Sequence, residues 1–284
     1  MPMAISRRRL LQCATLASGT ALWAWPGLAA AATRETARPF PLEAVRLSPS
    51  IWSTAVEANR AYLHRLEPDR LLHDFRVQSG LPPKGDRYGG WEEDTIAGHS
   101  LGHYLSACAL MHAQTGDGEC RVRARYIVSE LSACQRASGG GFVGAFSRRN
   151  EATGAIEPGR RVMEEIARGE IRSARFYLNG CWAPFYNWHK LFAGLLEAHR
   201  QAAVAPALEV ATGLAGYIEA TLSRLDDAQM QAVLGTEFGG MSEALAELFA
   251  RTGESRWLRL AERFHHRAVL DPLPVSHVFG VGPR

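Results

Sequence analysis

The sequence predicts an all-α fold in which helical hairpins stack into a partial α/α toroid of the (α/α)6-barrel type. Two observations support this prediction. Apolar residues recur at helical spacing over much of the chain, and a helix, a Thr-Gly-acid turn and a second helix occur twice, around residues 115–117 and 252–254. Helix pairs of this kind must stack on neighbouring pairs to bury their apolar faces. Since no helical pattern follows Leu270, we expect the toroid to be incomplete at its C-terminus.

Residues 1–32 have the pattern of a twin-arginine export signal. Arginines 7–9 precede a weakly apolar stretch and an alanine-rich region, 29–32, that is typical of a cleavage site. A membrane anchor is the alternative, but Ser, Thr, Gly, Gln and Pro26 keep the stretch weakly hydrophobic. We therefore expect the Tat translocase to export the protein to the periplasm or the medium. We expect no stable membrane anchor after cleavage, and a mature domain over 33–284.

The basic charge of the chain belongs to this leader. The sequence has 32 Lys and Arg and 29 Asp and Glu, and the leader contains three arginines and no acids. The mature chain is therefore formally neutral, and its charge gives no argument for a nucleic-acid partner.

The helices are expected in the following order. A proline-rich lead-in, 33–50, precedes a first helix over 51–66 with Ser50 as its N-cap. A short helix begins at Pro68, and a rigid loop covers 80–85. The apolar side of the first helix is expected at Ile51, Ala55, Ala58, Tyr62 and Leu66.

Three helical hairpins follow, over 101–135, 187–222 and 241–270. In the first and third, the turn glycine closes one helix in the left-handed conformation, and the acid begins the next helix near its positive end. Residues 138–186 interrupt this rhythm with a glycine run and predict a long functional insertion, with one helix near 161–168.

Polar and aromatic side chains gather where three loops lead into helices. These junctions are 89–94, 179–190 and 236–240. In a toroid, the N-terminal ends of the inner helices can converge on one pocket. We therefore expect the junctions to form a substrate site, with contacts from the following side chains: His189, Trp91, Glu92, His103, Glu237 and Asn187. Gly98, Gly102 and Ser106 leave one helix face open for close approach.

The residue types at the junctions suit carbohydrate. Aromatic rings offer flat apolar faces to sugars, and carboxylates, imidazoles and amides bond to hydroxyls. The aromatic residues are Trp91, Trp182, Tyr186 and Trp188, and packing in the core is the alternative for each tryptophan. The carboxylates that a glycosidase would use across a scissile bond are Glu92, Glu93, Asp94 and Glu237, with helix-dipole pairing as the alternative.

The histidines are interpreted as hydrogen-bonding groups. His99 and His103 have the spacing of a zinc pair, but residue 100 is serine, so the His-Glu-x-x-His motif is missing and we predict no metal ligand there. His189 is expected in the first turn of its helix, where the helix dipole disfavours its protonated form. A capping or packing role is the alternative for His189.

Four motifs in order resemble the β-L-arabinofuranosidase-like glycoside hydrolases of family 127, over about residues 41–273. The motifs are Leu81-Pro82-Pro83-Lys84, Tyr88-Gly89-Gly90-Trp91-Glu92, residues 98–107 (GHSLGHYLSA) and residues 186–195 (YNWHKLFAGL). The resemblance implies an α/α-toroid catalytic domain followed by β-sandwich domains. It implies release of terminal L-arabinofuranose from plant-type glycans with retention of configuration.

In that family a zinc-bound cysteine thiolate is the nucleophile, and further cysteines and a glutamate hold the zinc. The spacing of Cys108, Cys120, Cys134 and Cys181 does not match that cluster. We therefore expect no cofactor in this chain, zinc in the full-length family, truncation before the catalytic centre, and little or no hydrolysis by this chain alone. The catalytic residues are left unassigned. His189 matches a sugar-contacting histidine of the family, while Trp91, Glu92, His103 and Glu237 match motif positions.

Two alternatives stay open. A uronate polysaccharide lyase on the same toroid would use Asn187, His189 and Tyr186 to neutralise a carboxylate and abstract a proton. A non-catalytic carbohydrate-binding module would bind glycan without cleaving it.

Overall fold

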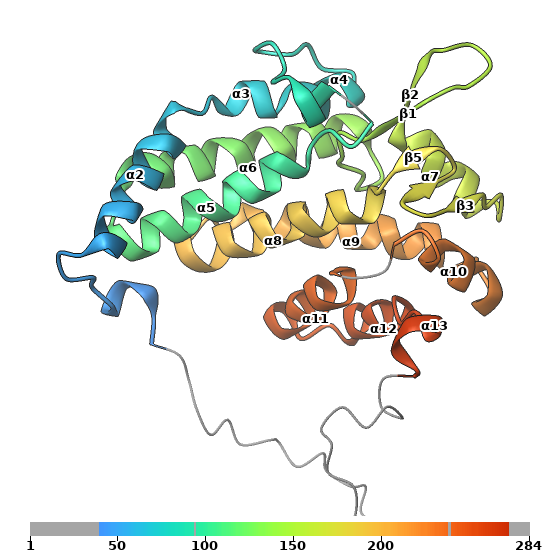
Figure 1. Ribbon diagram of the computed structural model, residues 1–284. Coiled ribbons are helices and arrows are strands. Elements are labelled where there is room, and N and C mark those ends of the chain that lie inside the picture. Colours follow the sequence, from blue (N-terminus) through green and yellow to red (C-terminus); the bar gives the residue numbers. More distant parts are fainter. Residues whose placement is uncertain (1–39, 94, 238–239, 273–284) are drawn as a thin grey trace, which may run out of the picture. The chain divides into compact units, whose positions relative to one another are not determined.

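The computed structural model describes residues 40–93, 95–237 and 240–272, which are mostly helical with one small sheet (Figure 1). The predicted export signal, 1–32, lies outside these residues. The described residues from Pro41 to Pro272 form one compact unit. Within the described ranges, no helix combines the length and hydropathy needed to cross a bilayer.

The elements follow in chain order. The helices before the sheet are η1 (Leu42–Ala44), α2 (Ile51–Arg65), α3 (Pro68–Leu71), α4 (His73–Gln78), η2 (Gly90–Glu93), α5 (His99–Thr115) and α6 (Gly118–Ser138). The sheet region contains β1 (Ser147–Arg149), β2 (Ile156–Pro158), α7 (Gly159–Ala167), β3 (Ser173–Ala174), β4 (Tyr177–Leu178) and β5 (Cys181–Trp182). The remaining helices are α8 (Pro184–Ala202), α9 (Pro206–Leu222), α10 (Asp227–Leu234), α11 (Met241–Thr252), α12 (Ser255–Arg263) and α13 (Arg267–Leu270).

The core lies among α5, α6, α8 and α9, which run side by side (Figure 1). The tightest approach is between α5 and α8. A Cβ added to Gly102 would lie 2.2 Å from the carbonyl oxygen of Lys190, and one added to Gly194 would lie 2.7 Å from the carbonyl oxygen of Gly102. Gly102 was expected to leave its face open to a ligand. Instead, the backbone of α8 occupies that face.

The two Thr-Gly-acid turns form as predicted. Gly116 and Gly253 have φ values of 77° and 73°, in the left-handed region where glycine is least strained. The Asp117 side chain caps α6 by accepting the Cys120 N–H at 2.8 Å. Glu254 makes no such cap at α12.

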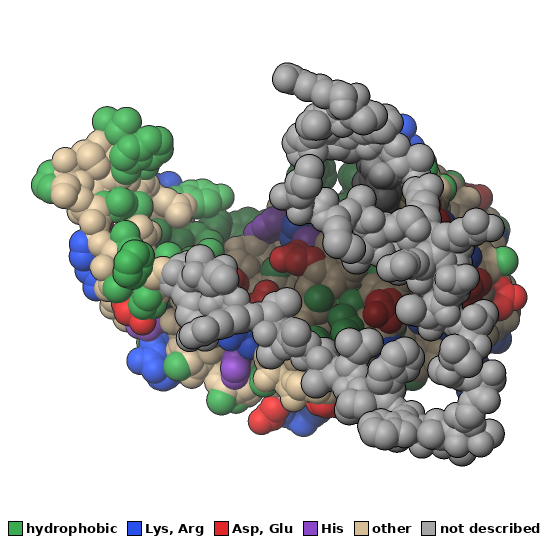
Figure 2. Space-filling view, turned by 90° about the horizontal axis from the view of Figure 1, so that it is seen from below, with side chains coloured by type: hydrophobic (Ala, Val, Ile, Leu, Met, Phe, Trp, Pro, Cys, Tyr) green, Lys and Arg blue, Asp and Glu red, His purple; other side chains and the backbone are tan. Residues whose placement is uncertain are grey.

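The first helix is confirmed, but the expected apolar side of α2 is not buried. Ser50 and Ser53 form a capping box at its start. Ile51 is 77% exposed and Tyr62 is 50% exposed, whereas Leu63 is the buried residue of this helix. Helical spacing identifies which residues share a face, but it does not say which face meets a neighbour. Figure 2 shows apolar side chains gathered at the edge that carries η1 and α2.

The insertion contains a small sheet and one helix. Its antiparallel sheet has the order β2-β1-β5-β4-β3, and α7 lies where one helix was predicted. The glycine run leads directly into the core, where Phe142 and Phe146 are buried. Arg148 of β1 donates hydrogen bonds to both carboxylate oxygens of Glu165, at 2.6 and 2.7 Å, and Nδ2 of Asn179 donates to the same carboxylate at 2.9 Å. Strands of two or three residues are too short to show alternation in the sequence, so the sheet was not predicted.

Candidate functional site

Glu237 joins the third junction to the start of α8. Its Oε1 accepts the Phe185 N–H at 2.5 Å, and its Oε2 accepts the Tyr186 N–H at 3.1 Å. The first N–H groups of a helix have no partner within the helix, so the carboxylate satisfies two of them. Burial raises the pKa of Glu237 to about 7, although the two N–H groups favour its ionised form.

Tyr186 lies at one end of a row of rings that continues through His99 to Trp91. Its hydroxyl is 3.2 Å from Nε2 of His103, and its ring centroid is 5.6 Å from that of His99. The ring centroid of Trp91 lies 5.8 Å from that of His99. Trp91 is 67% exposed, so a flat apolar face is available beside the His99 imidazole.

Glu92 and Asn187 support this row from within the protein. Glu92 is buried and accepts the Gly98 N–H at 3.0 Å. Asn187 is 2% exposed and donates from Nδ2 to the carbonyl oxygen of Ile96 at 2.7 Å. Nδ1 of His99 contacts the same carbonyl oxygen at 3.0 Å. The structure therefore gives Asn187 a role in fixing the turn before α5, and its amide is not at the surface.

His189 lies in the second turn of α8, because the helix begins at Pro184, earlier than the apolar pattern predicted. The prediction of a first-turn position was therefore wrong. Burial is the main cause of its lowered pKa; the Lys190 charge lowers it further, and Glu243 opposes the shift. Its Nε2 lies 3.2 Å from Oε2 of Glu243. Burial also lowers the pKa of His103. Both imidazoles therefore favour the neutral state.

These residues line two depressions that share Tyr186. The first depression, of about 620 Å³, is lined by Tyr186, His189 and Glu237 together with Arg175, Phe176, Ala183, Gly235, Thr236, Gly240 and His266. The second depression, of about 560 Å³, includes Trp91, Glu92, His99, His103 and Tyr186 in its lining. Five of the six predicted contact residues line one of the two depressions, and the sixth, Asn187, lines neither depression. Figure 2 shows histidine, acidic and apolar side chains close together on the face seen from below.

The comparisons with known proteins agree on one family. The profile of the β-L-arabinofuranosidase GH127 catalytic domain matches residues 44–277. The chain belongs to glycoside hydrolase family 127. A solved structure, Ara127N, a GH127 β-L-arabinofuranosidase from Geobacillus stearothermophilus T6, matches with a TM-score of 0.52 and 19% identity. The match covers 78% of this chain and 32% of Ara127N, so it spans about a third of that relative and shows a shared fold. No curated protein matches the chain.

Family 127 is consistent with a zinc centre in its full-length members, but the described linings do not fit one. Cys108, Cys120, Cys134 and Cys181 are free and buried, and none lines either depression. Burial raises the pKa of the Cys181 thiol, which opposes formation of a reactive thiolate. The described linings of the two depressions therefore contain no thiol that could hold zinc.

Two tryptophans expected near the sugar have other contacts. Trp188 is 1% exposed and donates from Nε1 to the Val143 carbonyl oxygen at 2.9 Å, so packing is the correct interpretation for it. Trp182 is half-buried and stacks on Tyr177 with ring centroids 6.2 Å apart. Asp94 lies outside the described residues.

Sequence reasoning missed part of the first depression. Phe176 and Ala183, with φ values of 68° and 46°, line it from the sheet region. The Phe176 N–H donates to the Thr236 carbonyl oxygen at 3.0 Å, which holds the insertion against the third junction. The only signal in the sequence was the length of the insertion, since left-handed non-glycine residues carry no sequence mark of their own.

Proposed function

We propose that this chain forms a sugar-binding wall of an exported β-L-arabinofuranosidase-type hydrolase that acts on arabinose-containing plant-type glycans. Its helical hairpins would form part of an α/α toroid. The observation that carries the proposal is the position of Tyr186, which lines both depressions and contacts His103. One helix N-terminus thereby links the aromatic row at Trp91 to the imidazole at His189.

The side chains at these depressions suit a neutral pentose. The exposed Trp91 ring offers an apolar surface for the C–H groups of a furanose. Neutral imidazoles can each donate and accept one hydrogen bond, which matches the hydroxyl groups of a sugar. The lowered pKa values of His103 and His189 therefore favour hydroxyl recognition over binding of an anion.

The described linings favour binding over cleavage. Hydrolysis by two carboxylates requires both to reach opposite sides of the scissile bond. Glu92 and Glu237 line the depressions, yet both accept hydrogen bonds from backbone N–H groups of the protein. No thiol joins them in either described lining. We expect this chain alone to bind the sugar and to release little or no product.

An assay with an aryl β-L-arabinofuranoside, in the presence of zinc and a reductant, tests this proposal. We expect aryl release at the rate of the protein-free control. Robust turnover by the purified chain would show that the catalytic groups have been misplaced. Calorimetric titration of the same glycoside gives the binding result independently of turnover.

The lyase alternative has less geometric support. It requires Asn187 at the surface to neutralise a uronate carboxylate, whereas this amide is buried against Ile96. An increase in absorbance from an unsaturated product, with an anionic polysaccharide as substrate, would support the lyase alternative. A non-catalytic binding module would bind the glycan saturably and would not cleave it. It would also not cleave the glycan when the other domains of a full-length family member are added.

Export is tested separately from sugar binding. Replacing Arg7 and Arg8 with lysine in the leader should abolish export of a fused folded reporter by the Tat translocase. Unchanged export of the double variant would contradict the twin-arginine proposal.

A further inference from the structure

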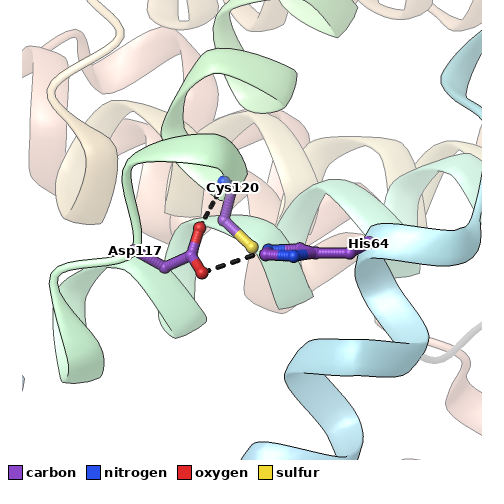
Figure 3. A group of neighbouring side chains, drawn as sticks. All are labelled: His64, Asp117 and Cys120. Carbon is purple, nitrogen blue, oxygen red and sulfur yellow. Dashed lines mark hydrogen bonds and ion pairs between the residues drawn. The ribbon is translucent and has the colours of Figure 1, made fainter.

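Three side chains that suit a metal ion meet where the end of α2 faces the α5–α6 turn (Figure 3). They are His64, Asp117 and Cys120, and one ligand atom from each lies within 4.8 Å of the other two. Nε2 of His64 is 3.1 Å from Oδ2 of Asp117. None of the three residues lines either depression described above.

The helix cap fixes two of these ligands. Oδ1 of Asp117 accepts the Cys120 N–H at 2.8 Å, which places the Cys120 sulfur beside the carboxylate. Oδ2 remains directed toward His64 (Figure 3). The Asp117 side chain is 4% exposed and Cys120 is fully buried, whereas the His64 side chain is 33% exposed. The imidazole is therefore the most exposed of the three ligands.

An unpartnered nitrogen distinguishes this cluster from an ordinary helix cap. Nε2 of His64 is buried and makes no hydrogen bond to any described residue, although it faces Oδ2 of Asp117 at ion-pair distance, 3.1 Å. A buried nitrogen without a partner is costly unless something else satisfies it. Arg60 approaches the same carboxylate from one side, with Nη1 at 3.5 Å from Oδ2.

The repeated turn gives an internal comparison. In the third hairpin, Glu254 occupies the place of Asp117, and Trp257 occupies the place of Cys120. Glu254 makes no side-chain cap there. Closing a helical hairpin of this kind therefore does not require the aspartate and the cysteine.

We propose that His64, Asp117 and Cys120 bind one zinc ion that ties α2 to the α5–α6 hairpin. An imidazole nitrogen, a carboxylate oxygen and a thiolate sulfur are the donors that zinc prefers, and water would supply a fourth ligand. On binding, the Cys120 thiol loses its proton to solvent and its sulfur bonds to zinc.

Metal titration of the purified, chelator-treated chain tests this site without any sugar. We expect the chain to bind one equivalent of zinc. With cobalt as a probe in place of zinc, we expect a thiolate-to-metal charge-transfer band in the absorption spectrum. Cys120→Ala should abolish the band, and His64→Gln should weaken zinc binding by at least about tenfold. Cys134→Ala is the matched control, because Cys134 is also buried in α6 but lies outside the cluster.

Asp117→Asn guards against loss of folding, because asparagine is an equally good helix cap but a poorer zinc ligand. This variant should keep its circular dichroism spectrum and lose zinc affinity. The proposal is overturned if the wild-type chain binds less than stoichiometric zinc. It is also overturned if zinc binding is the same in the wild-type, Cys120→Ala and His64→Gln proteins. Neither result depends on the proposed carbohydrate function.

Discussion

Oε2 of Glu237 accepts the backbone N–H of Tyr186 at 3.1 Å, and this bond holds the loop before α11 on the first turn of α8. Tyr186 is also the residue shared by the two depressions. The position of the site therefore depends on a buried carboxylate that caps a helix distant from it in sequence.

Replacing Glu237 with alanine should destabilise the protein. The substitution leaves the N–H groups of Phe185 and Tyr186 without their acceptor, and loss of a helix cap costs about 1–2 kcal/mol. Urea unfolding at a pH below the raised pKa of Glu237 measures this change. Glu151→Ala removes an exposed glutamate of a surface turn and should change the free energy of unfolding by less than about 0.5 kcal/mol. Equal stability of the two variants would contradict the capping role.

Glu237 should also make stability depend on pH. Burial raises its pKa from 4.5 to about 7 in the folded state, so the folded protein binds this proton more tightly than the unfolded chain. Its contribution to the free energy of unfolding is therefore largest below about pH 4.5 and declines by up to roughly 3 kcal/mol as pH rises through 7.

Glu237→Gln removes this titration while keeping the size of the side chain. The free energy of unfolding should be compared at about pH 5 and about pH 7.5, on either side of the titration. Relative to the variant, the wild-type protein should be less stable at the higher pH than at the lower pH. Taking the difference cancels groups that titrate in both proteins. A constant difference at both pH values would mean that the pKa of Glu237 is not raised.

Gly102→Ala should disrupt the packing of α5 on α8. The new methyl group would lie 2.2 Å from the Lys190 carbonyl oxygen, and overpacking against a helix backbone should cost about 3 kcal/mol or more. Gly118→Ala is the matched control, because a Cβ at the start of α6 meets nothing within 4 Å. The control should be unchanged or slightly more stable. Thermal unfolding of both variants distinguishes these outcomes, and a Gly102→Ala protein as stable as the control would refute the close approach.

Replacement of Trp188 with alanine should lower the free energy of unfolding far more than replacement of Trp91. Trp188 is buried among aromatic side chains, so Trp188→Ala should lower the free energy of unfolding by about 3–5 kcal/mol. Trp91 is exposed, so Trp91→Ala should change it by less than about 0.5 kcal/mol. Denaturant unfolding gives both values. A large loss in the Trp91 variant would indicate a packing role in place of a sugar platform.

Much of the helical fold could be predicted because its signals are local. The Ser50 cap, the proline at the start of α3 and the two Thr-Gly-acid turns each act within a few residues. The buried face of α2 could not be predicted in this way, because burial depends on which neighbour covers the helix. The small sheet was missed for the related reason that its pairing is long-range while its strands are very short.

The site was predictable as a set of junctions but not in its geometry. One pocket was expected, but Trp91 and His103 line one depression and His189 and Glu237 line another, and the two share Tyr186; their role in binding stays a prediction. Asn187 and Trp188 are neighbours of His189 in sequence, yet both point into the protein, because successive helix positions face different directions.

The central claim is that the residues on both sides of Tyr186 form one carbohydrate site. Calorimetric titration of an aryl β-L-arabinofuranoside into the wild-type, Trp91→Ala and His189→Ala proteins tests it most directly. The account predicts saturable binding of one ligand, weakened about tenfold, or about 1.4 kcal/mol, by each substitution. Absence of saturable binding, or affinity left unchanged by either substitution, would contradict it.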